Sequence, residues 1–269
     1  MMRNSLCAAV VAACLAAPVL AGGASWPGLQ QTLYGARFLA PAGDLIAIDA
    51  PYRSDMDSRT RIGAAVTAPE GTLLDRVTVI LDENPMPVSA VFAFAAPLPA
   101  FVFDVTLRVN GPTPLHVVAE TEDGRLLVAE GFVKTSGQGA CAAPPGTDPA
   151  AALASLGEMV IEVTAPDRLA ALLKAPAGDA ARLDLDISHP SHSGMQMDQI
   201  SLLFIPARYV DRLQIDLDGR GYVDVTGSIS LSENPRLSVS VPRRSRTVDV
   251  TLTDTDGTVT KAHKAIADF

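Results

Sequence analysis

Short segments in which apolar and polar residues alternate recur along most of the chain. The clearest runs cover residues 246–252 and 105–109, where every second side chain is apolar. Period two places successive side chains on opposite faces of a strand, which suits a sheet with one buried and one solvated face. Asp-Gly pairs at 123–124, 218–219 and 256–257 are typical hairpin turns. The pattern therefore favours an all-β chain.

The candidate strands form two sets. The first comprises residues 45–49, 62–67, 74–81, 88–94, 101–109, 115–121 and 125–133, and the second comprises 159–164, 182–188, 208–217, 221–231, 237–241, 247–254 and 258–266. About seven short strands per hundred residues, with turns between them, are typical of a β-sandwich. We predict two immunoglobulin-like sandwich domains, with short helices after Ser25 and, in the linker, after Asp148-Pro149.

The first 21 residues have the order of features found in a secretory signal peptide. Arg3 is their only charge, an apolar run follows from 6 to 20, and Ala21 ends a small-residue cleavage motif. Lipid attachment at Cys14 fits less well, because it would leave the apolar run 15–20 on the mature protein. We expect cleavage after Ala21, export to a periplasm, and no other segment that spans a membrane.

Between the two sets of strands the composition changes to Gly, Ala, Pro and Ser. Residues 136–157 form the predicted linker, between domains at 22–135 and 158–269. Residues 136–146 have no large apolar side chain and gain little from burial, so we expect an exposed arm. It holds Cys141, the only cysteine left after signal cleavage. An exposed thiol in an oxidising compartment is reactive, although a linker cysteine without any role is the plainer interpretation.

Other patterns exclude several classes of function. A net charge of −9 and an isoelectric point near 4.9 argue against nucleic-acid binding. The absence of a Cys-x-x-Cys motif argues against a dithiol oxidoreductase. His189 and His192 have a metal-like spacing without a third ligand nearby, so we expect His189 to shape the turn before Pro190 and His192 to lie in the following loop. Asp254–Gly257 resembles a calcium loop but lacks its closing glutamate, and a hairpin turn fits better. We expect no metal and no cofactor.

Several motifs, taken together, resemble one known family. The arm around Cys141, the segments 81–87 and 119–125, and the second-half motifs at 187–190, 193–195, 205–207 and 232–235 are similar to those of sulfur carriers. The first half resembles SoxY and the second resembles SoxZ, so the chain is similar to a SoxY–SoxZ fusion of the type associated with quinoprotein dehydrogenases. The arm departs from the family's Gly-Gly-Cys-Gly-Gly, because Ala140 and Ala142 flank the cysteine.

This resemblance implies a function. SoxY and SoxZ are immunoglobulin-like sandwiches that pair, and the SoxY cysteine carries sulfur intermediates, as in thiosulfate oxidation, between enzymes. By similarity Cys141 is the covalent attachment point, and Gly137, Gly139 and Gly146 are hinges of a swinging arm. The two halves would pair within the chain, and sulfur-oxidation enzymes or a quinoprotein dehydrogenase system would be its partners.

Two other classes of function stay open from the sequence. One is a binding or maturation factor for a periplasmic quinoprotein dehydrogenase in which Cys141 is dispensable. The other is an enzyme in which Cys141 acts as a nucleophile beside a histidine. Because a mobile arm is a poor scaffold for a preorganised catalytic site, the sequence favours a carrier that is not itself an enzyme.

Overall fold

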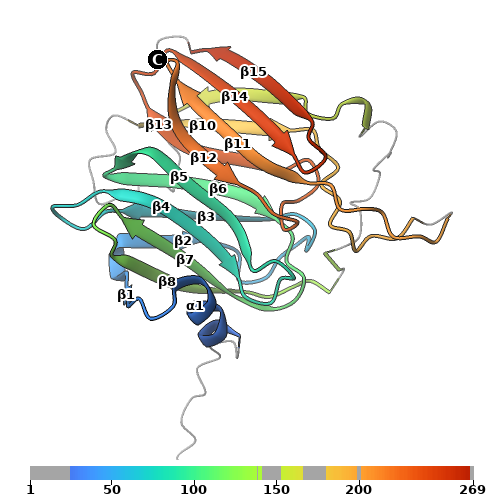
Figure 1. Cartoon of the computed structure of the whole chain (residues 1–269), viewed down its shortest axis with the longest axis horizontal. Helices are drawn as coiled ribbons and strands as arrows, with labels where there is room; N and C mark the ends of the chain where they lie inside the picture. The colour runs from blue at the N-terminus through green and yellow to red at the C-terminus, as the bar shows by residue number, and fades with distance from the viewer. Residues whose placement is uncertain (1–24, 138, 141–152, 166–179, 199–200, 267–269) are drawn as a thin grey trace, which may run out of the picture.

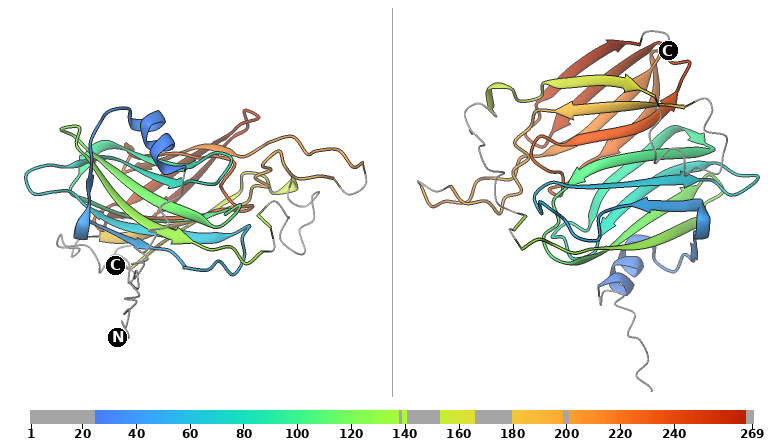
Figure 2. Two further views of the ribbon diagram at one scale, coloured as in Figure 1. Left: turned by 90° about the horizontal axis from the view of Figure 1, so that it is seen from below. Right: turned by 180° about the vertical axis from the view of Figure 1, so that it is seen from behind.

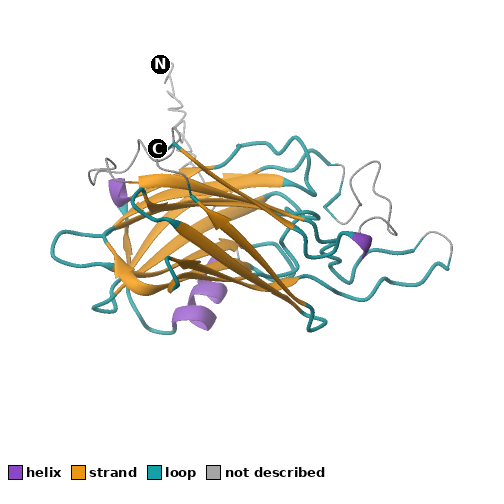
Figure 3. Ribbon diagram, turned by 90° about the horizontal axis from the view of Figure 1, so that it is seen from above, coloured by secondary structure: helices purple, strands orange, loops and turns teal. Residues whose placement is uncertain are grey.

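The computed structural model describes residues 25–137, 139–140, 153–165, 180–198 and 201–266. Figures 1 and 3 show two sheets packed face to face, so the predicted all-β fold class is confirmed. Among these residues no helix is long and apolar enough to cross a membrane. The predicted signal peptide, Cys141, Gly146 and most of the predicted linker helix lie outside the described residues, and the predicted domain bounds stay predictions.

In the part of the chain that the structure describes, the first half contains one α-helix, one 3₁₀ turn and eight strands. They are α1 (Trp26–Tyr34), β1 (Leu39–Pro41), η1 (Gly43–Leu45), β2 (Ile46–Asp49), β3 (Thr60–Thr67), β4 (Leu74–Leu81), β5 (Val88–Leu98), β6 (Ala100–Leu107), β7 (Thr113–Thr121) and β8 (Leu126–Val133). The short strand β1 has no counterpart among the predicted strands, because three residues are too few to show a period.

The second half contributes seven strands to the described structure. They are β9 (Met159–Thr164), β10 (Ala180–Ile187), β11 (Val210–Leu217), β12 (Arg220–Thr226), β13 (Arg236–Pro242), β14 (Thr247–Asp254) and β15 (Val259–Ala265). The strand predicted over 221–231 is shorter than expected and ends at Thr226. The Gly227 N–H donates a hydrogen bond to the Asp211 carbonyl at 2.8 Å. The residues that follow leave the sheet and contact the first half of the chain, where the Ser230 carbonyl accepts the Arg108 N–H.

The two halves repeat one strand order in opposite directions. The first half supplies β8-β7-β4-β5 to one sheet and β2-β3-β6 to the other, and the second half supplies β15-β14-β11-β12 and β9-β10-β13. Counterpart strands then meet, because β5 pairs antiparallel with β12 and β6 pairs antiparallel with β13. The halves are therefore related by a pseudo-two-fold axis at their junction (Figures 1 and 2).

One hydrophobic core runs through the junction. Phe92 of β5 lies opposite Val225 of β12, and its ring centroid is 4.5 Å from that of Phe103 on β6. All three side chains are buried and belong to one cluster that extends through both halves. Edge-to-edge pairing also covers four strand edges that would otherwise be open to another chain. The sequence predicted that the halves pair, but not that they share both sheets.

Helix α1 lies against the outer face of the larger sheet (Figure 1). Ser25 stands at its N-cap as predicted, but its hydroxyl donates to Glu83 at 2.7 Å and its oxygen accepts no N–H of the helix backbone. Trp26 and Leu29 pack on a small cluster around Ile80, whereas Leu33 is exposed. Apolar contacts from Trp26 to Tyr34, together with the bond from Ser25 to Glu83 in the loop after β4, hold the helix in place.

Candidate cysteine-arm site

The arm begins where β8 ends, and the loop between β2 and β3 fixes its first residues. The Lys134 N–H donates to the Tyr52 carbonyl at 2.7 Å, and the Ser54 N–H donates to the Lys134 carbonyl at 2.8 Å. The Arg53 guanidinium also donates to the Thr135 carbonyl at 3.2 Å. These bonds extend the β-type pairing beyond the strand, so the arm leaves the sandwich at a defined point.

Asp57 anchors the next part of the arm. Its carboxylate accepts the N–H groups of Ser136 at 2.6 Å and Gly137 at 3.0 Å, and its side chain is buried. Burial favours the neutral acid, but the donors from Ser136, Gly137 and Gly139 outweigh it and lower the pKa of Asp57. A charged carboxylate therefore holds the base of the arm. Sequence reasoning missed Asp57, which carries no local motif.

Two of the predicted hinge residues lie at this anchor. Gly137 has a φ of 93° and Gly139 a φ of 85°, a region that residues with a Cβ rarely adopt. The space around both positions is open, so the backbone conformation is what requires glycine there. Ala140 is buried at 3 % exposure, so its Cβ packs against the protein. The role of Gly137, Gly139 and Gly146 as hinges stays a prediction.

Beside the arm base, loops of the two halves are joined by buried polar contacts. The Asn84 amide donates to the Arg108 carbonyl at 2.8 Å and to the Ser230 hydroxyl at 2.9 Å. The Arg108 guanidinium in turn donates to the Leu231 carbonyl. The next residue, Val109, donates its N–H to the Asp57 carbonyl at 2.8 Å, which links this joint to the arm anchor. The platform beneath the arm thus includes both halves of the chain.

The tripeptide Glu-Asn-Pro occurs at residues 83–85 and again at 233–235, in places of the two halves that are not equivalent. Asn84 follows β4, whereas Asn234 precedes β13. Asn234 pairs with the His189 backbone, accepting its N–H at 2.9 Å and donating to its carbonyl at 2.8 Å. In both places the asparagine of the tripeptide fixes a neighbouring loop.

His189 and His192 serve the loop between β10 and β11. His189 is buried and its Nδ1 accepts the Ser191 N–H at 2.9 Å. Burial lowers the pKa of His189 to about 4, although Asp254 lies 3.5 Å from its Nε2, and burial also lowers the pKa of His192. The described residues contain no group of three potential metal ligands. The predicted turn role of His189 therefore fits the structure.

The calcium-like segment is a hairpin turn, as predicted. One oxygen of Asp254 accepts the N–H groups of Asp256 at 3.0 Å and Thr258 at 2.7 Å. The other oxygen accepts the Arg208 guanidinium at 2.8 Å. Both oxygens of the carboxylate are thus used inside the protein.

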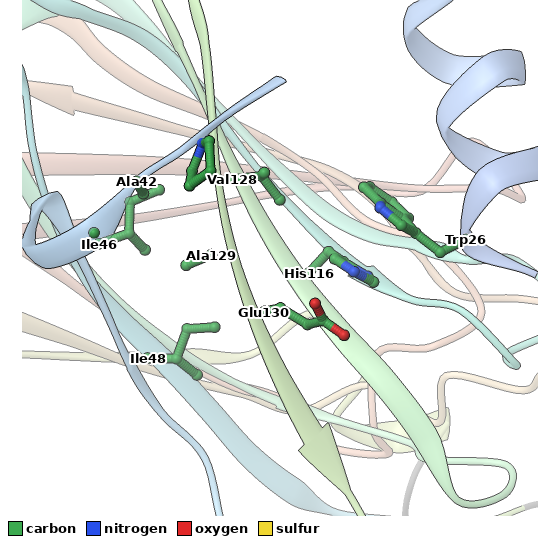
Figure 4. Close-up of a pocket in the computed structure, with 10 residues that line it drawn as sticks. Trp26, Ala42, Ile46, Ile48, His116, Val128, Ala129 and Glu130 are labelled. Atoms are coloured by element: carbon green, nitrogen blue, oxygen red, sulfur yellow. The ribbon is translucent and has the colours of Figure 1, made fainter. Parts of the chain in front are cut away.

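A separate cavity of about 560 Å³ lies between α1 and β8 (Figure 4). The Trp26 ring stacks on His116 at a centroid distance of 3.6 Å, and Glu130 lines the same space. His116 is buried and its Nδ1 lies 2.9 Å from an Asp82 oxygen. Neither Asp57 nor any described arm residue lines this cavity, so it is separate from the arm site.

Comparison with known proteins defines the class of molecule. Two family models match in tandem, "Sulfur oxidation protein SoxY" over residues 30–141 and "Sulphur oxidation protein SoxZ" over residues 172–265. Together they cover most of the chain, whose class is therefore that of the sulfur-oxidation carrier family. The chain belongs to the SoxY and SoxZ families as a SoxYZ-like fusion, so the predicted resemblance to these two families is confirmed. Its association with quinoprotein dehydrogenases stays a prediction.

Among solved structures, the chain is similar to the sulfur carrier protein SoxY from Chlorobium limicola f thiosulfatophilum. The two are 19% identical, with a TM-score of 0.36, over 41% of this chain and 90% of that chain. No curated protein matches this chain.

Proposed function

We propose that this protein is an exported carrier that holds a sulfur-containing intermediate covalently on Cys141 and presents it to partner enzymes. One observation carries the proposal. The SoxY match ends at residue 141, directly after an arm base that Asp57 fixes, and a SoxZ domain follows in the same chain. The sulfur-oxidation family explains why a lone cysteine stands at that place.

The geometry of the arm base supports a carrier. Ser136 and Gly137 are tied to a buried carboxylate, so movement of the cargo residue would begin from a fixed point. The platform beneath is rigid, because both sheets continue through the two halves. A short tether on a rigid body keeps its cargo at high local concentration for a docked enzyme. SoxY and SoxZ proteins are carriers or partners of enzymes, and we propose that this chain is not an enzyme and needs no cofactor.

The chemistry of loading depends on the sulfur donor. Exchange with a disulfide-level donor breaks its S–S bond, joins one sulfur to Cys141, and releases a thiolate that takes up the thiol proton. No electrons leave the system in that reaction. Attachment of thiosulfate is different, because joining the outer sulfur of the thiosulfate dianion to a thiol releases the thiol proton and two electrons. A loading enzyme with an electron acceptor must then take part.

Location and partners follow from the same proposal. A signal peptide at residues 1–21 would deliver the chain to the periplasm, where sulfur-oxidation enzymes or a quinoprotein dehydrogenase system would load and unload the arm. The fusion makes the pairing of SoxY-like and SoxZ-like halves independent of protein concentration. One polypeptide would thus serve in place of a two-chain carrier.

Intact-mass measurement tests the carrier role. The protein is purified from the periplasm of the organism that encodes it, without reductant, beside a Cys141→Ser variant. We expect a mass increase of a sulfur atom or a thiosulfonate group that reductant removes and that the variant lacks. A free thiol in the native protein, together with full activity of the variant in cells, would instead favour a dehydrogenase-binding or maturation factor. Turnover of a small substrate by the protein alone would indicate an enzyme.

A further inference from the structure

The loop between β10 and β11 contains a hairpin with an unusually apolar surface. We define the apolar hairpin as the described residues 195–198 and 201–204. Large apolar side chains on it are exposed by 36% to 69%, namely Met195, Met197, Leu202, Leu203 and Phe204. Single exposed apolar side chains are ordinary on a protein surface, but a cluster of five marks an interaction site.

Hydrogen bonds hold the hairpin in a fixed shape. The Asp198 N–H donates to the Leu203 carbonyl at 2.9 Å, and the Ile205 N–H donates to the Gln196 carbonyl at 2.8 Å. The Asp198 carboxylate accepts both the N–H and the hydroxyl of Ser201, at 2.6 and 2.8 Å. The charge of Asp198 is thus used within the hairpin, and the outer surface that remains is formed mainly by hydrocarbon and thioether groups.

The base of the hairpin is tied to the core of the second half. The Arg208 N–H donates to the His192 carbonyl at 2.9 Å, and the Arg208 guanidinium pairs with the buried Asp254. Gly194 approaches Ala207 so closely that a Cβ at position 194 would lie 3.2 Å from the Ala207 Cβ. The apolar side chains are therefore carried on a braced projection and not on a loose loop.

The hairpin projects from the end of the sandwich at which the arm begins. Figure 1 shows this orange projection beside the green end of the chain segment that follows β8, and both views of Figure 2 show the two segments at the same end of the molecule. Asp57 and Val109, which fix the arm base, belong to loops at this end. A protein that receives the arm would meet the hairpin in the same encounter.

We propose that the apolar hairpin docks in an apolar recess beside the active-site entrance of the enzyme that loads or unloads the arm; this inference rests on the proposed carrier function. A membrane is a poor alternative, because residues 188–207 contain no lysine or arginine to bind anionic headgroups, and the chain carries a net charge of −9. The docking partner is therefore a protein with an uncharged, hydrophobic contact surface.

The first test measures loading in cells. The double variant Leu203→Asp/Phe204→Asp places charge on the hairpin, and Val259→Asp is the matched control, because Val259 is 56% exposed on the edge strand β15. In the native organism we expect the loaded fraction of Cys141, measured by intact mass, to fall at least about tenfold in the double variant and to stay within about twofold in the control. The rate at which 5,5′-dithiobis(2-nitrobenzoate) modifies the reduced, purified proteins reports the thiol itself and should be equal in all of them. Unchanged loading of the double variant would overturn the proposal.

A second measurement separates this inference from the carrier function. A benzoylphenylalanine photocrosslinker at position 203 is activated in the same cells, in chains with and without Cys141→Ser. We expect one discrete crosslink to an enzyme of sulfur transfer or dehydrogenation. If the native chain carried no sulfur adduct but gave this crosslink, the carrier function would fail and docking would stand. Crosslinks only to lipid or to a second copy of the chain, or none at all, would overturn docking.

Discussion

The carboxylate of Asp57 accepts the backbone N–H of Ser136 at 2.6 Å, across 79 positions of the sequence. This contact joins a loop of the β-sandwich to the first residues of the cysteine arm. The carboxylate is buried, and it accepts the Gly137 N–H as well. Hydrogen bonds to a charged acceptor are among the strongest single contacts in proteins. Asp57 therefore holds Ser136 and Gly137, in addition to the bonds that fix Lys134 and Thr135, and its removal should have specific consequences.

Replacement of Asp57 with Asn tests this attachment. The amide is neutral and offers one acceptor oxygen, so we expect the free energy of unfolding to fall by about 1–3 kcal/mol. We also expect faster proteolysis between residues 134 and 140. Urea unfolding and limited proteolysis with mass spectrometry measure the two effects. Asp55→Asn, an exposed change in the same loop, is the control and should have neither effect. Equal behaviour of the two variants would show that Asp57 does not hold the arm.

The effect of Asp57 should also depend on pH. The pKa of this carboxyl is lower in the folded protein than in the unfolded chain, where it is near 4. Its contribution to the free energy of unfolding is therefore complete above about pH 4. As pH falls through the lower folded value, that contribution is lost. We therefore expect the stability difference between the native chain and Asp57→Asn to be constant from pH 7 to 5 and to shrink below about pH 4. Urea midpoints across this range give the measurement.

The sequence predicts best those parts of the molecule whose contacts join residues close together in the chain. Strands at 74–81, 159–164 and 247–254 agree with β4, β9 and β14 in both bounds, because period two is written in neighbouring residues. The junction between the two halves is harder to predict, because its strands are far apart in the sequence. One local signal exists: residues 101–105 are apolar at all but one position, and in the structure they are buried on both faces of the strand. Asp57 has no local pattern at all, since its partners lie far away in the sequence.

The polar joint between the halves should control the stability of the whole molecule. Asn84→Ala removes two buried donors and the acceptor of the Asn110 N–H, and it leaves the Arg108 carbonyl with one fewer partner. We expect the free energy of unfolding to fall by about 2–4 kcal/mol. Because the halves share one core, calorimetry should still show a single transition, at lower temperature. Gln214→Ala on exposed strand surface should shift the transition by less than about 0.5 kcal/mol. Two separated transitions would contradict a shared core.

Restoring the family's glycine beside the cysteine should release the arm. Ala140 is buried at 3 % exposure directly before Cys141, so Ala140→Gly removes a packed methyl group and adds backbone freedom. We expect iodoacetamide to alkylate Cys141 about two- to fivefold faster, with a loss of global stability below about 1 kcal/mol. Ala129→Gly on β8 is a control for the general effect of glycine. A rate equal to that of the native protein would mean that packing of Ala140 does not restrain the thiol.

His189 should make folding sensitive to mild acid. Its folded pKa of about 4 lies below the unfolded value near 6.5, because burial disfavours the charged ring. The groups that bear on it are Asp254, which favours its proton, and Arg208 and His192, which oppose it. Between these two pH values the unfolded chain binds a proton that the folded protein does not. The contribution of His189 to the free energy of unfolding is therefore complete above about pH 6.5, and it decreases toward pH 4 by about 3 kcal/mol at most.

Two variants isolate this pH dependence. His189→Gln keeps an acceptor that can reach the Ser191 N–H, and it cannot take up a proton in this range. We expect its free energy of unfolding to be lower at pH 7 and to decrease less steeply from pH 6.5 to 4 than that of the native protein. A residual decrease is expected, because burial also lowers the pKa of His192, which this variant keeps. His263→Gln, an exposed histidine on β15, should keep the native slope. If His189→Gln kept the full native slope, the acid sensitivity would have to arise from other groups, and burial of a neutral His189 would not be its cause.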